Sequence, residues 1–340
     1  MPEPRGVGLV VGKFAPLHAG HQFLIETARA ASGATVIAVY DSPGYGPTVR
    51  VRANWIRRLY PDTLVLELDD PVPQGDPEDV SRAYAEHLRS RYAGPPVTHV
   101  FSSEEYGARF ARELRAEHIP VDPERRRLPV SATLVRSNPF AFRHYLDPGV
   151  YRSLVVKVCF VGAESTGKTT LAEAVAERHG TVWMPEYGRE LFELERGALV
   201  FGDLLRIARE HLRREEKLLE HANRFLLCDT NAITTEFWSR FYFGTADPEL
   251  EQLARSVERD YAYVLCANDI PWVQDGWRET GGGELWLEHQ ETIRADLEAR
   301  GLDYIEASGP VPERVERVSR WLDERGSYSG PACPLSSPAR

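Results

Sequence analysis

The chain has 340 residues, which corresponds to about two domains at roughly 150 residues each. Its 42% hydrophobic and 27% charged residues exclude a disordered, collagen-like or coiled-coil protein. The net charge of −10 argues against a general nucleic-acid-binding protein, although it leaves room for local cationic pockets that bind small phosphates. Neither a long apolar run nor a signal-peptide pattern is present, so we expect a cytoplasmic protein with no membrane or nucleic-acid partner.

The first half of the chain alternates between strand and helix patterns. Expected strands cover residues 6–12, 34–41, 63–69 and 97–103. Expected helices cover residues 18–31, 51–60, 79–92 and 104–118. This alternation predicts a parallel sheet covered by helices on both faces. A turn-rich segment at 137–153 then predicts a domain boundary near residue 150.

The same alternation restarts after the boundary. Expected strands cover residues 153–162, 181–184, 225–230, 260–269 and 301–307. Expected helices include 167–180, with Gly180 as its stop signal, and a charged helix within 201–224. The fold class is therefore α/β with two parallel-sheet domains, residues 1–150 and 151–325. We expect residues 326–340 to form a disordered tail. Three cysteines in strand-like runs are expected to be buried thiols.

The segment GKFAPLHAGH, residues 12–21, joins the first strand to the first helix. His18 and His21 are three residues apart, so they share one face at the start of a helix. Gly12 allows the backbone to approach a ligand closely, and the helix N-terminus offers free N–H groups to a phosphate. The pattern resembles the HxGH signature of the nucleotidyltransferase superfamily. The resemblance makes His18, His21 and Lys13 candidate catalytic residues, with Gly12 and Phe14 in the nucleotide site.

A second element of that superfamily, ISSTxxR, has a counterpart in VSATLVR at residues 130–136. Ser131 is an expected helix N-cap, and Arg136 follows Thr133 by about one helical turn. Ser131 and Thr133 are candidate nucleotide-binding residues, and Arg136 is a candidate catalytic residue.

GAESTGKT at residues 162–169 fits the phosphate-binding loop G-x-x-x-x-G-K-[ST] between a strand and a helix. Its backbone N–H groups are expected to surround a β-phosphate, Lys168 to reach the β- and γ-phosphates, and Thr169 to bind Mg²⁺. The expected nucleotide-binding residues are Gly162, Glu164, Ser165, Thr166, Gly167, Lys168, Thr169 and Thr170.

Three further residues are candidates for phosphoryl transfer. Asp229 ends an apolar strand, where a carboxylate next to Mg²⁺ is expected. Glu186 in PEYGRE could accept a proton from a substrate hydroxyl. Arg278 lies in the glycine-rich segment 275–283, which is typical of a lid that contacts the transferring phosphate. The sequence does not decide between Asp229 and Glu186 as the general base.

Together these motifs resemble the bifunctional NadR family, which joins a nicotinamide-nucleotide adenylyltransferase to a ribosylnicotinamide kinase. The resemblance covers residues 7–320 and also includes FSSEEYG and CDTNAITTEFW. It implies a Rossmann-like nucleotidyltransferase domain followed by a P-loop kinase domain. Some members carry an N-terminal helix-turn-helix domain, for which this chain has no room, so DNA binding is not expected.

The resemblance implies two consecutive steps of NAD biosynthesis. Ribosylnicotinamide would be phosphorylated by ATP to nicotinamide mononucleotide (NMN), and NMN would take an adenylyl group from a second ATP to give NAD and pyrophosphate. Mg²⁺ is the implied cofactor.

Two alternatives stay open. The same folds could serve another phosphorylated metabolite and another nucleoside, or the chain could be a nucleotide-sensing module without turnover. Acceptor specificity, oligomeric state (a homo-oligomer included), feedback regulation and transfer of NMN between the sites are not decided by the sequence.

Overall fold

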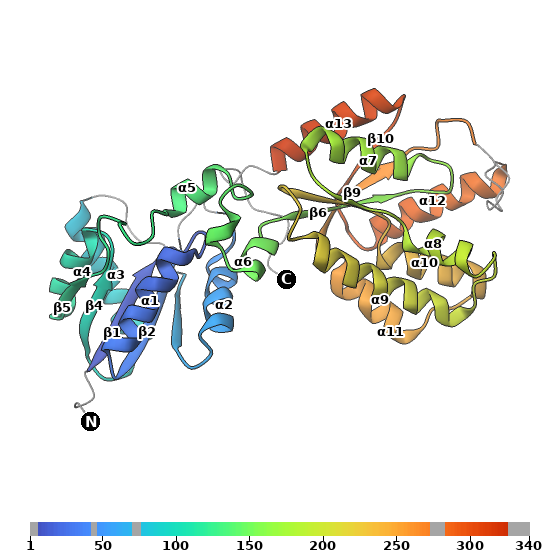
Figure 1. Cartoon of the computed structure of the whole chain (residues 1–340). Helices are drawn as coiled ribbons and strands as arrows, with labels where there is room; N and C mark the ends of the chain where they lie inside the picture. Colours follow the sequence, from blue (N-terminus) through green and yellow to red (C-terminus); the bar gives the residue numbers. More distant parts are fainter. Residues whose placement is uncertain (1–5, 42–45, 70–75, 273–282, 326–340) are drawn as a thin grey trace. The chain divides into compact units, whose positions relative to one another are not determined.

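The computed structural model describes residues 6–41, 46–69, 76–272 and 283–325. The described residues up to Tyr151 form one compact unit, and those from Arg152 onward form a second unit. Each unit is built on a five-stranded parallel sheet with helices between the strands, which confirms the α/β class with two parallel sheets (Figure 1). Within the described residues, every helix is too short or too polar to cross a lipid bilayer.

The first unit follows the predicted alternation. Its strands are β1 (Val7–Gly12), β2 (Ala34–Tyr40), β3 (Leu64–Leu68), β4 (Val97–Ser102) and β5 (Glu117–Pro120), in the sheet order β3-β2-β1-β4-β5. Its helices are α1 (Ala19–Ala31), α2 (Val49–Leu59), α3 (Pro77–Arg91), α4 (Tyr106–Leu114), α5 (Ala132–Ser137) and α6 (Pro148–Arg152), with a 3₁₀ turn, η1, at Arg143–Tyr145.

Strand β1 lies at the centre of this sheet, and all six of its residues are buried. One face of the sheet packs against α3 and α4 through a cluster that includes Leu9, Leu88 and Phe110. Helices α1 and α2 contact strands β1, β2 and β3, and they bury side chains such as Ile25 and Ile56. The strand order changes direction between β1 and β4, and ligands bind at the carboxyl ends of strands at such a point.

The expected helix at 104–118 is wrong in its second half. Helix α4 ends at Leu114, because Arg115 adopts a left-handed conformation with φ of 57°. The chain then forms the edge strand β5, which pairs with β4 in parallel register from His99 and Glu117 onward. Because β5 is short and only half-buried, it lacks the apolar pattern that predicts a strand.

The second unit has the same kind of sheet. Its strands are β6 (Val156–Val161), β7 (Trp183–Met184), β8 (Phe225–Asp229), β9 (Tyr261–Cys266) and β10 (Tyr304–Ala307), in the order β10-β9-β6-β8-β7. Its helices are α7 (Lys168–His179), α8 (Tyr187–Leu194), α9 (Phe201–Leu218), α10 (Ala232–Phe243), α11 (Pro248–Val257), α12 (Glu284–Ala299) and α13 (Val311–Arg325).

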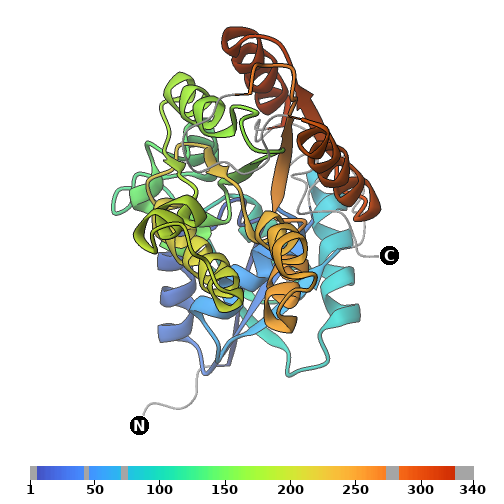
Figure 2. The same cartoon turned by 90° about the vertical axis from the view of Figure 1, so that its right-hand side faces the viewer.

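Helices cover both faces of this second sheet. Helices α7 and α13 pack on one face through a buried cluster that includes Phe160, Val175 and Leu322. Helices α9, α10 and α11 contact one another on the opposite face (Figures 1 and 2). Helix α7 ends at Gly180 in a left-handed conformation, as its stop signal predicts. The loop 162–167 follows the central strand β6 and therefore lies at the carboxyl edge of the sheet, between two layers of helices.

Candidate functional site

The turn from β1 to α1 places the two histidines against each other. His18 is the N-cap of α1, and its Nδ1 accepts a hydrogen bond from the Gly20 N–H at 3.1 Å. The His18 N–H donates to Nδ1 of His21 at 3.4 Å, and the two rings stack with centroids 3.8 Å apart. The expected common face therefore forms through reciprocal capping of the helix, and the first turn of α1 fixes both imidazoles.

Arg52 of α2 stabilises the turn between β1 and α1 through hydrogen bonds to backbone carbonyls. Its side chain is fully buried, and its guanidinium donates to the backbone carbonyls of Lys13, Tyr40 and Pro47. It also forms an ion pair with Asp41 at 3.0 Å. One arginine thus joins the end of β1, the end of β2 and the chain leading to α2. The sequence motif gives no sign of this contact, because Arg52 lies 31 residues after His21.

A cavity of about 270 Å³ opens beside the histidines. It is lined by His18, Gly20, His21, Phe23, Ser103, Glu104, Val121, Asp122, Arg125, Leu128, Val130, Ser131, Ala132 and Thr133. Burial, assisted by the positive charges of Arg125 and Arg136, lowers the pKa of His18 to about 4. Burial and the neighbouring His18 lower the pKa of His21 well below its usual value. Both imidazoles are therefore neutral at pH 7.

The VSATLVR segment lies at the same cavity. Ser131 caps α5 as predicted, because its Oγ accepts a hydrogen bond from the Leu134 N–H at 3.1 Å. Arg136 donates to the Ala15 carbonyl at 2.6 Å and to Thr133 Oγ1 at 3.0 Å, so it joins α5 to the loop before α1. The structure therefore brings His18, His21, Ser131 and Thr133 around one cavity, with Arg136 bracing its two sides.

Four predicted residues of the first unit, Arg136 among them, lie outside the lining of this cavity. Phe14 is buried beneath the histidines, with its ring 5.0 Å from that of His21. Gly12 faces that phenyl ring, and a Cβ at this position would lie 3.3 Å from it. Lys13 directs its Nζ toward the Tyr40 ring, 5.9 Å from the centroid. Gly12 and Phe14 thus shape the loop, and Lys13 lies near the end of β2.

The phosphate loop of the second unit turns sharply between β6 and α7. Gly162, Ser165 and Gly167 have φ angles of 144°, 61° and 80°. At Gly162 a Cβ would lie only 2.8 Å from the backbone oxygen of Cys266, so glycine is required by both conformation and space. Such a turn exposes successive N–H groups at the helix start, which is the geometry that binds phosphate.

Side chains from α12 and α13 fix the outer side of this loop. Gln290 accepts a hydrogen bond from the Ala163 N–H at 2.9 Å and donates to the Cys266 carbonyl at 3.0 Å. Trp286 Nε1 donates to the Glu164 carbonyl at 2.6 Å. Buried Arg314 donates to the Thr166 carbonyl at 2.8 Å and forms an ion pair with Asp269.

The ends of β6 and β8 bring the predicted phosphoryl-transfer residues together. Lys168 donates to the carbonyls of Gly162 and Ala163, at 3.0 and 2.9 Å, so it lies across its own loop. Thr169 donates a short hydrogen bond to Oδ2 of Asp229, and the buried Oδ1 of Asp229 has no hydrogen-bond partner. Burial raises the pKa of Asp229, although the positive charge of Lys168 and the hydrogen bond from Thr169 oppose this shift.

Thr169 and Asp229 fit a magnesium site. They offer adjacent oxygen ligands, and one carboxylate oxygen is buried without a partner. No group of three or more His, Cys, Asp or Glu side chains arranged for a metal ion occurs in the part of the chain that the structure describes. This sparse set suits Mg²⁺, which in nucleotide sites is held by one or two protein oxygens together with substrate phosphates.

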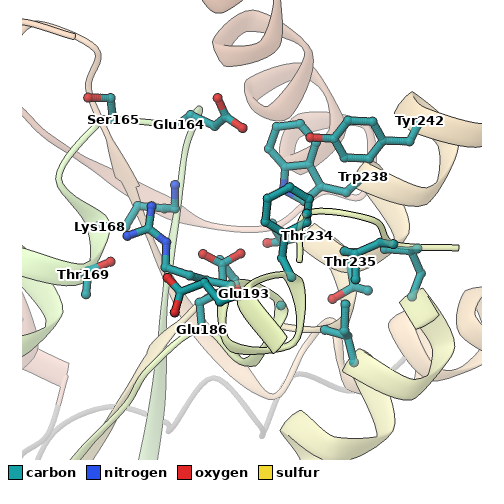
Figure 3. A pocket seen from close by; sticks show the side chains of 18 of the residues that line it. Glu164, Ser165, Lys168, Thr169, Glu186, Glu193, Thr234, Thr235, Trp238 and Tyr242 are labelled. Carbon is teal, nitrogen blue, oxygen red and sulfur yellow. The ribbon is translucent and has the colours of Figure 1, made fainter. Parts of the chain in front are cut away.

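A cavity of about 620 Å³ extends from this loop (Figure 3). Lys168, Thr169 and Glu186 lie on one side of it, whereas Trp238 and Tyr242 of α10 form an aromatic wall with stacked rings 5.5 Å apart. Of the predicted loop residues, Glu164, Ser165, Gly167, Lys168, Thr169 and Thr170 line the cavity. Gly162 and Thr166 support it from behind, since the Thr166 hydroxyl donates to the Ala163 carbonyl.

Glu186 is the N-cap residue of α8 and reaches this cavity. Burial raises its pKa to about 7, and the negative charge of Asp229 adds to the shift. Its position is fixed by the neighbouring residue, because the Tyr187 N–H donates to Nε2 of buried His211 at 2.9 Å. Glu186 can therefore exchange a proton near neutral pH.

The sequence motifs missed most of the supporting residues. Arg125 and Asp122 in the first cavity, and Phe192, Glu193, Tyr242 and Phe243 in the second, carry no motif of their own, whereas Glu104 lies in the motif FSSEEYG. Trp238 lies in the motif CDTNAITTEFW, which marks the start of α10. Arg278 lies outside the described residues.

Comparison with known proteins supports this architecture. A family model described as an AAA domain matches residues 157–314. The trifunctional NAD biosynthesis/regulator protein NadR of Salmonella typhimurium LT2 is 28% identical, over 95% of this chain and 85% of the relative. The protein of the same name from Escherichia coli K12 is 27% identical, over 89% and 79% of the two chains.

Two crystal structures share the fold across nearly the whole chain. A NadR protein in complex with NR gives a TM-score of 0.59, with 21% identity over 95% of this chain and 96% of that one. A NadR protein in complex with NAD and AMP-PNP gives a TM-score of 0.57, with 21% identity over 99% of this chain and 98% of that one.

Fold and site together define a two-unit α/β protein with a cavity at the motif residues of each unit, the second beside a phosphate-binding loop in the region that the AAA-domain model matches. The resemblance to the NadR family that the motifs indicate agrees with the relatives of that name, and the two crystal structures share the fold.

Replacing Arg52 should destabilise the first unit. Arg52→Met leaves the carbonyls of Lys13, Tyr40 and Pro47 without their donor, and we expect the free energy of unfolding to fall by about 3 kcal/mol. Exposed Arg50 on the same helix is the control, and Arg50→Met should change the free energy of unfolding by less than about 0.5 kcal/mol. Chemical denaturation followed by circular dichroism measures both, and equal stability of the two variants would contradict this role.

Proposed function

We propose that this chain is a bifunctional enzyme of NAD biosynthesis. The second unit would phosphorylate ribosylnicotinamide with ATP to give NMN, and the first would transfer an adenylyl group from ATP to NMN to give NAD and pyrophosphate. The observation that carries the proposal is that a cavity lies at the motif residues of each unit, at the start of the helix after a central strand. The relatives named for NAD biosynthesis support it.

In the kinase step the 5′-hydroxyl of ribosylnicotinamide attacks the γ-phosphate of ATP. An alcohol must lose its proton, and we assign this proton to Glu186 rather than to Asp229. Glu186 lines the cavity and has a pKa near 7, whereas Asp229 is buried beneath it and bonded to Thr169. Lys168 leaves its loop carbonyls to bind the phosphates. Mg²⁺, held by Thr169 and Asp229, would neutralise phosphate charge.

The aromatic wall of Trp238 and Tyr242 is suited to the pyridinium ring of ribosylnicotinamide. Aromatic faces attract a cationic ring, and stacked contacts of this kind orient a planar group. The ribose would then lie between this wall and Glu186, on the side of the cavity that faces Lys168 (Figure 3).

In the adenylyl-transfer step the nucleophile is the phosphate of NMN, which is already ionised at neutral pH. No strong base is needed, so the first unit has to position the two substrates and stabilise the charge that develops on the leaving pyrophosphate. His18 can do this as a neutral hydrogen-bond donor, because helix capping uses only its Nδ1. The ring of His21 accepts from the His18 N–H and also bonds the Pro16 backbone, so it would have to exchange that second bond for one to substrate. Ser131 can donate its hydroxyl proton while its oxygen accepts from Leu134.

Two substitutions should separate the activities. His18→Asn keeps a side-chain acceptor for the α1 cap, and we expect NAD formation from NMN to fall by about 10²–10³-fold while phosphorylation of ribosylnicotinamide is retained. Lys168→Ala should have the reverse effect, with exposed Lys217→Ala as the control. Separate assays of the two half-reactions on folded variants measure this. Loss of both activities from either substitution would refute the assignment of two sites.

The kinase step should depend on pH through Glu186. Because the carboxylate is the active form and its pKa is about 7, kcat/KM should rise with pH up to about 7 and then level off. Glu186→Gln should lower kcat by about 10²–10⁴-fold and remove this dependence. Asp229→Asn should instead raise the Mg²⁺ concentration needed for half-maximal rate. A Glu186→Gln variant that keeps the wild-type pH profile would rule out Glu186 as the base.

A further inference from the structure

The cavity of the first unit contains a cationic side chain that no motif identifies. Arg125 follows β5 and lines the cavity together with His18, His21, Ser131 and Thr133. Of the described residues that line this cavity, Arg125 alone is a lysine or arginine. Within this described lining Arg125 therefore supplies the positive charge, since burial lowers the pKa of both histidines; the charge of Arg136, outside the lining, also reaches His18.

The loop that carries Arg125 is held in an unusual conformation. Asp122 and Arg125 both adopt left-handed backbone angles, with φ of 45° and 51°. The Asp122 carboxylate accepts hydrogen bonds from the N–H groups of Arg126, Arg127 and Leu128, at 2.9, 3.1 and 3.3 Å. Non-glycine residues keep such angles only where surrounding contacts fix them. The loop is thus fixed by its own acidic residue, with the Arg125 side chain at the cavity.

The counter-ion of Arg125 is weakly held. Its Nη2 lies 3.4 Å from Oε1 of Glu104, and the two side chains are 42% and 57% exposed. Exposed pairs of this length contribute little to stability and exchange readily with solvent ions. Asp122, the other acid at this cavity, is already bonded to three backbone N–H groups. Among the acidic residues that the structure describes at this cavity, Glu104 is therefore the one that competes with an entering anion for the guanidinium.

We propose that Arg125 binds the phosphate groups of the nucleotide in this cavity, and that Glu104 is the exchangeable counter-ion which they displace. The proposal rests on the adenylyl-transfer function proposed above. A guanidinium binds two phosphate oxygens at once through parallel N–H groups, which a neutral imidazole cannot do. The ligand class is a polyphosphate or phosphate ester. Ser131 and the two imidazoles add neutral donors around it.

The test uses four substitutions in the full chain. Arg125→Met should raise the KM for ATP in NAD formation by about 10–100-fold, the range expected when a charged hydrogen bond is lost. Arg125→Lys should recover part of this loss, because a point charge replaces the fork. Arg126→Met is the matched control, since Arg126 is the adjacent residue, its side chain is 81% exposed and it lies outside the cavity lining; its KM should stay within about twofold.

Glu104→Gln distinguishes anion binding from a structural role. Removing the competing carboxylate should lower the dissociation constant for an anion by a few-fold, whereas loss of a structural ion pair would leave it unchanged or raise it. Binding of inorganic tripolyphosphate, measured by calorimetry in a Lys168→Ala background, reports on this cavity without the P-loop site. The Arg125→Met variant in that background should bind tripolyphosphate about 10–100-fold more weakly.

Three outcomes overturn or limit the proposal. Unchanged KM and unchanged tripolyphosphate binding in Arg125→Met would overturn it while leaving NAD formation intact. Unchanged or weaker tripolyphosphate binding in Glu104→Gln would overturn the exchange with Glu104. Tripolyphosphate binding that depends on Arg125 in a protein that makes no NAD from NMN would support the anion site and refute the proposed adenylyl transfer.

Discussion

Both units depend on one constraint, which is that the loop at the carboxyl end of the central strand has to be held in place by side chains from other elements. The two loops turn from a buried central strand into a helix, and each has backbone carbonyls that accept hydrogen bonds from other elements. Buried side chains bind those carbonyls in each case. Arg52 binds the carbonyl of Lys13, and Arg314 binds that of Thr166 with help from Trp286 and Gln290. The position of each loop therefore depends on residues that need not contact the substrate.

Burial also sets the charge of the groups at both sites. It lowers the pKa of His18 to about 4 and raises that of Glu186 to about 7, so each group favours its neutral form before substrate binds. Neutral imidazoles suit a site whose nucleophile arrives already ionised. A carboxylate that takes up a proton near pH 7 suits a site whose nucleophile is an alcohol. Of the two reactions that we propose, the kinase step needs a proton acceptor and the adenylyl-transfer step needs none. The pKa values of Glu186 and of His18 suit this difference.

The sequence predicted the parts of this protein that local pattern controls. Strands such as β9 are continuous apolar runs, Ser131 begins a helix and Gly180 ends one through their own conformational preferences, and both motif loops have fixed spacing. The edge strand β5 was missed because it is not buried enough to show a pattern. Arg52, Arg125, Gln290 and Arg314 were missed for another reason. Their partners are backbone carbonyls, N–H groups or cavity walls supplied by distant segments, and only the fold brings these together.

The most direct test of the whole account is the product balance of the complete reaction. Purified protein is given ribosylnicotinamide, ATP and Mg²⁺, and the products are identified and counted by mass spectrometry. If both units act in sequence, each NAD formed is accompanied by one ADP from the kinase step and one pyrophosphate from the transfer step. Formation of ADP and NMN without NAD or pyrophosphate, or the absence of turnover in a folded protein that binds ATP, would contradict the central claim.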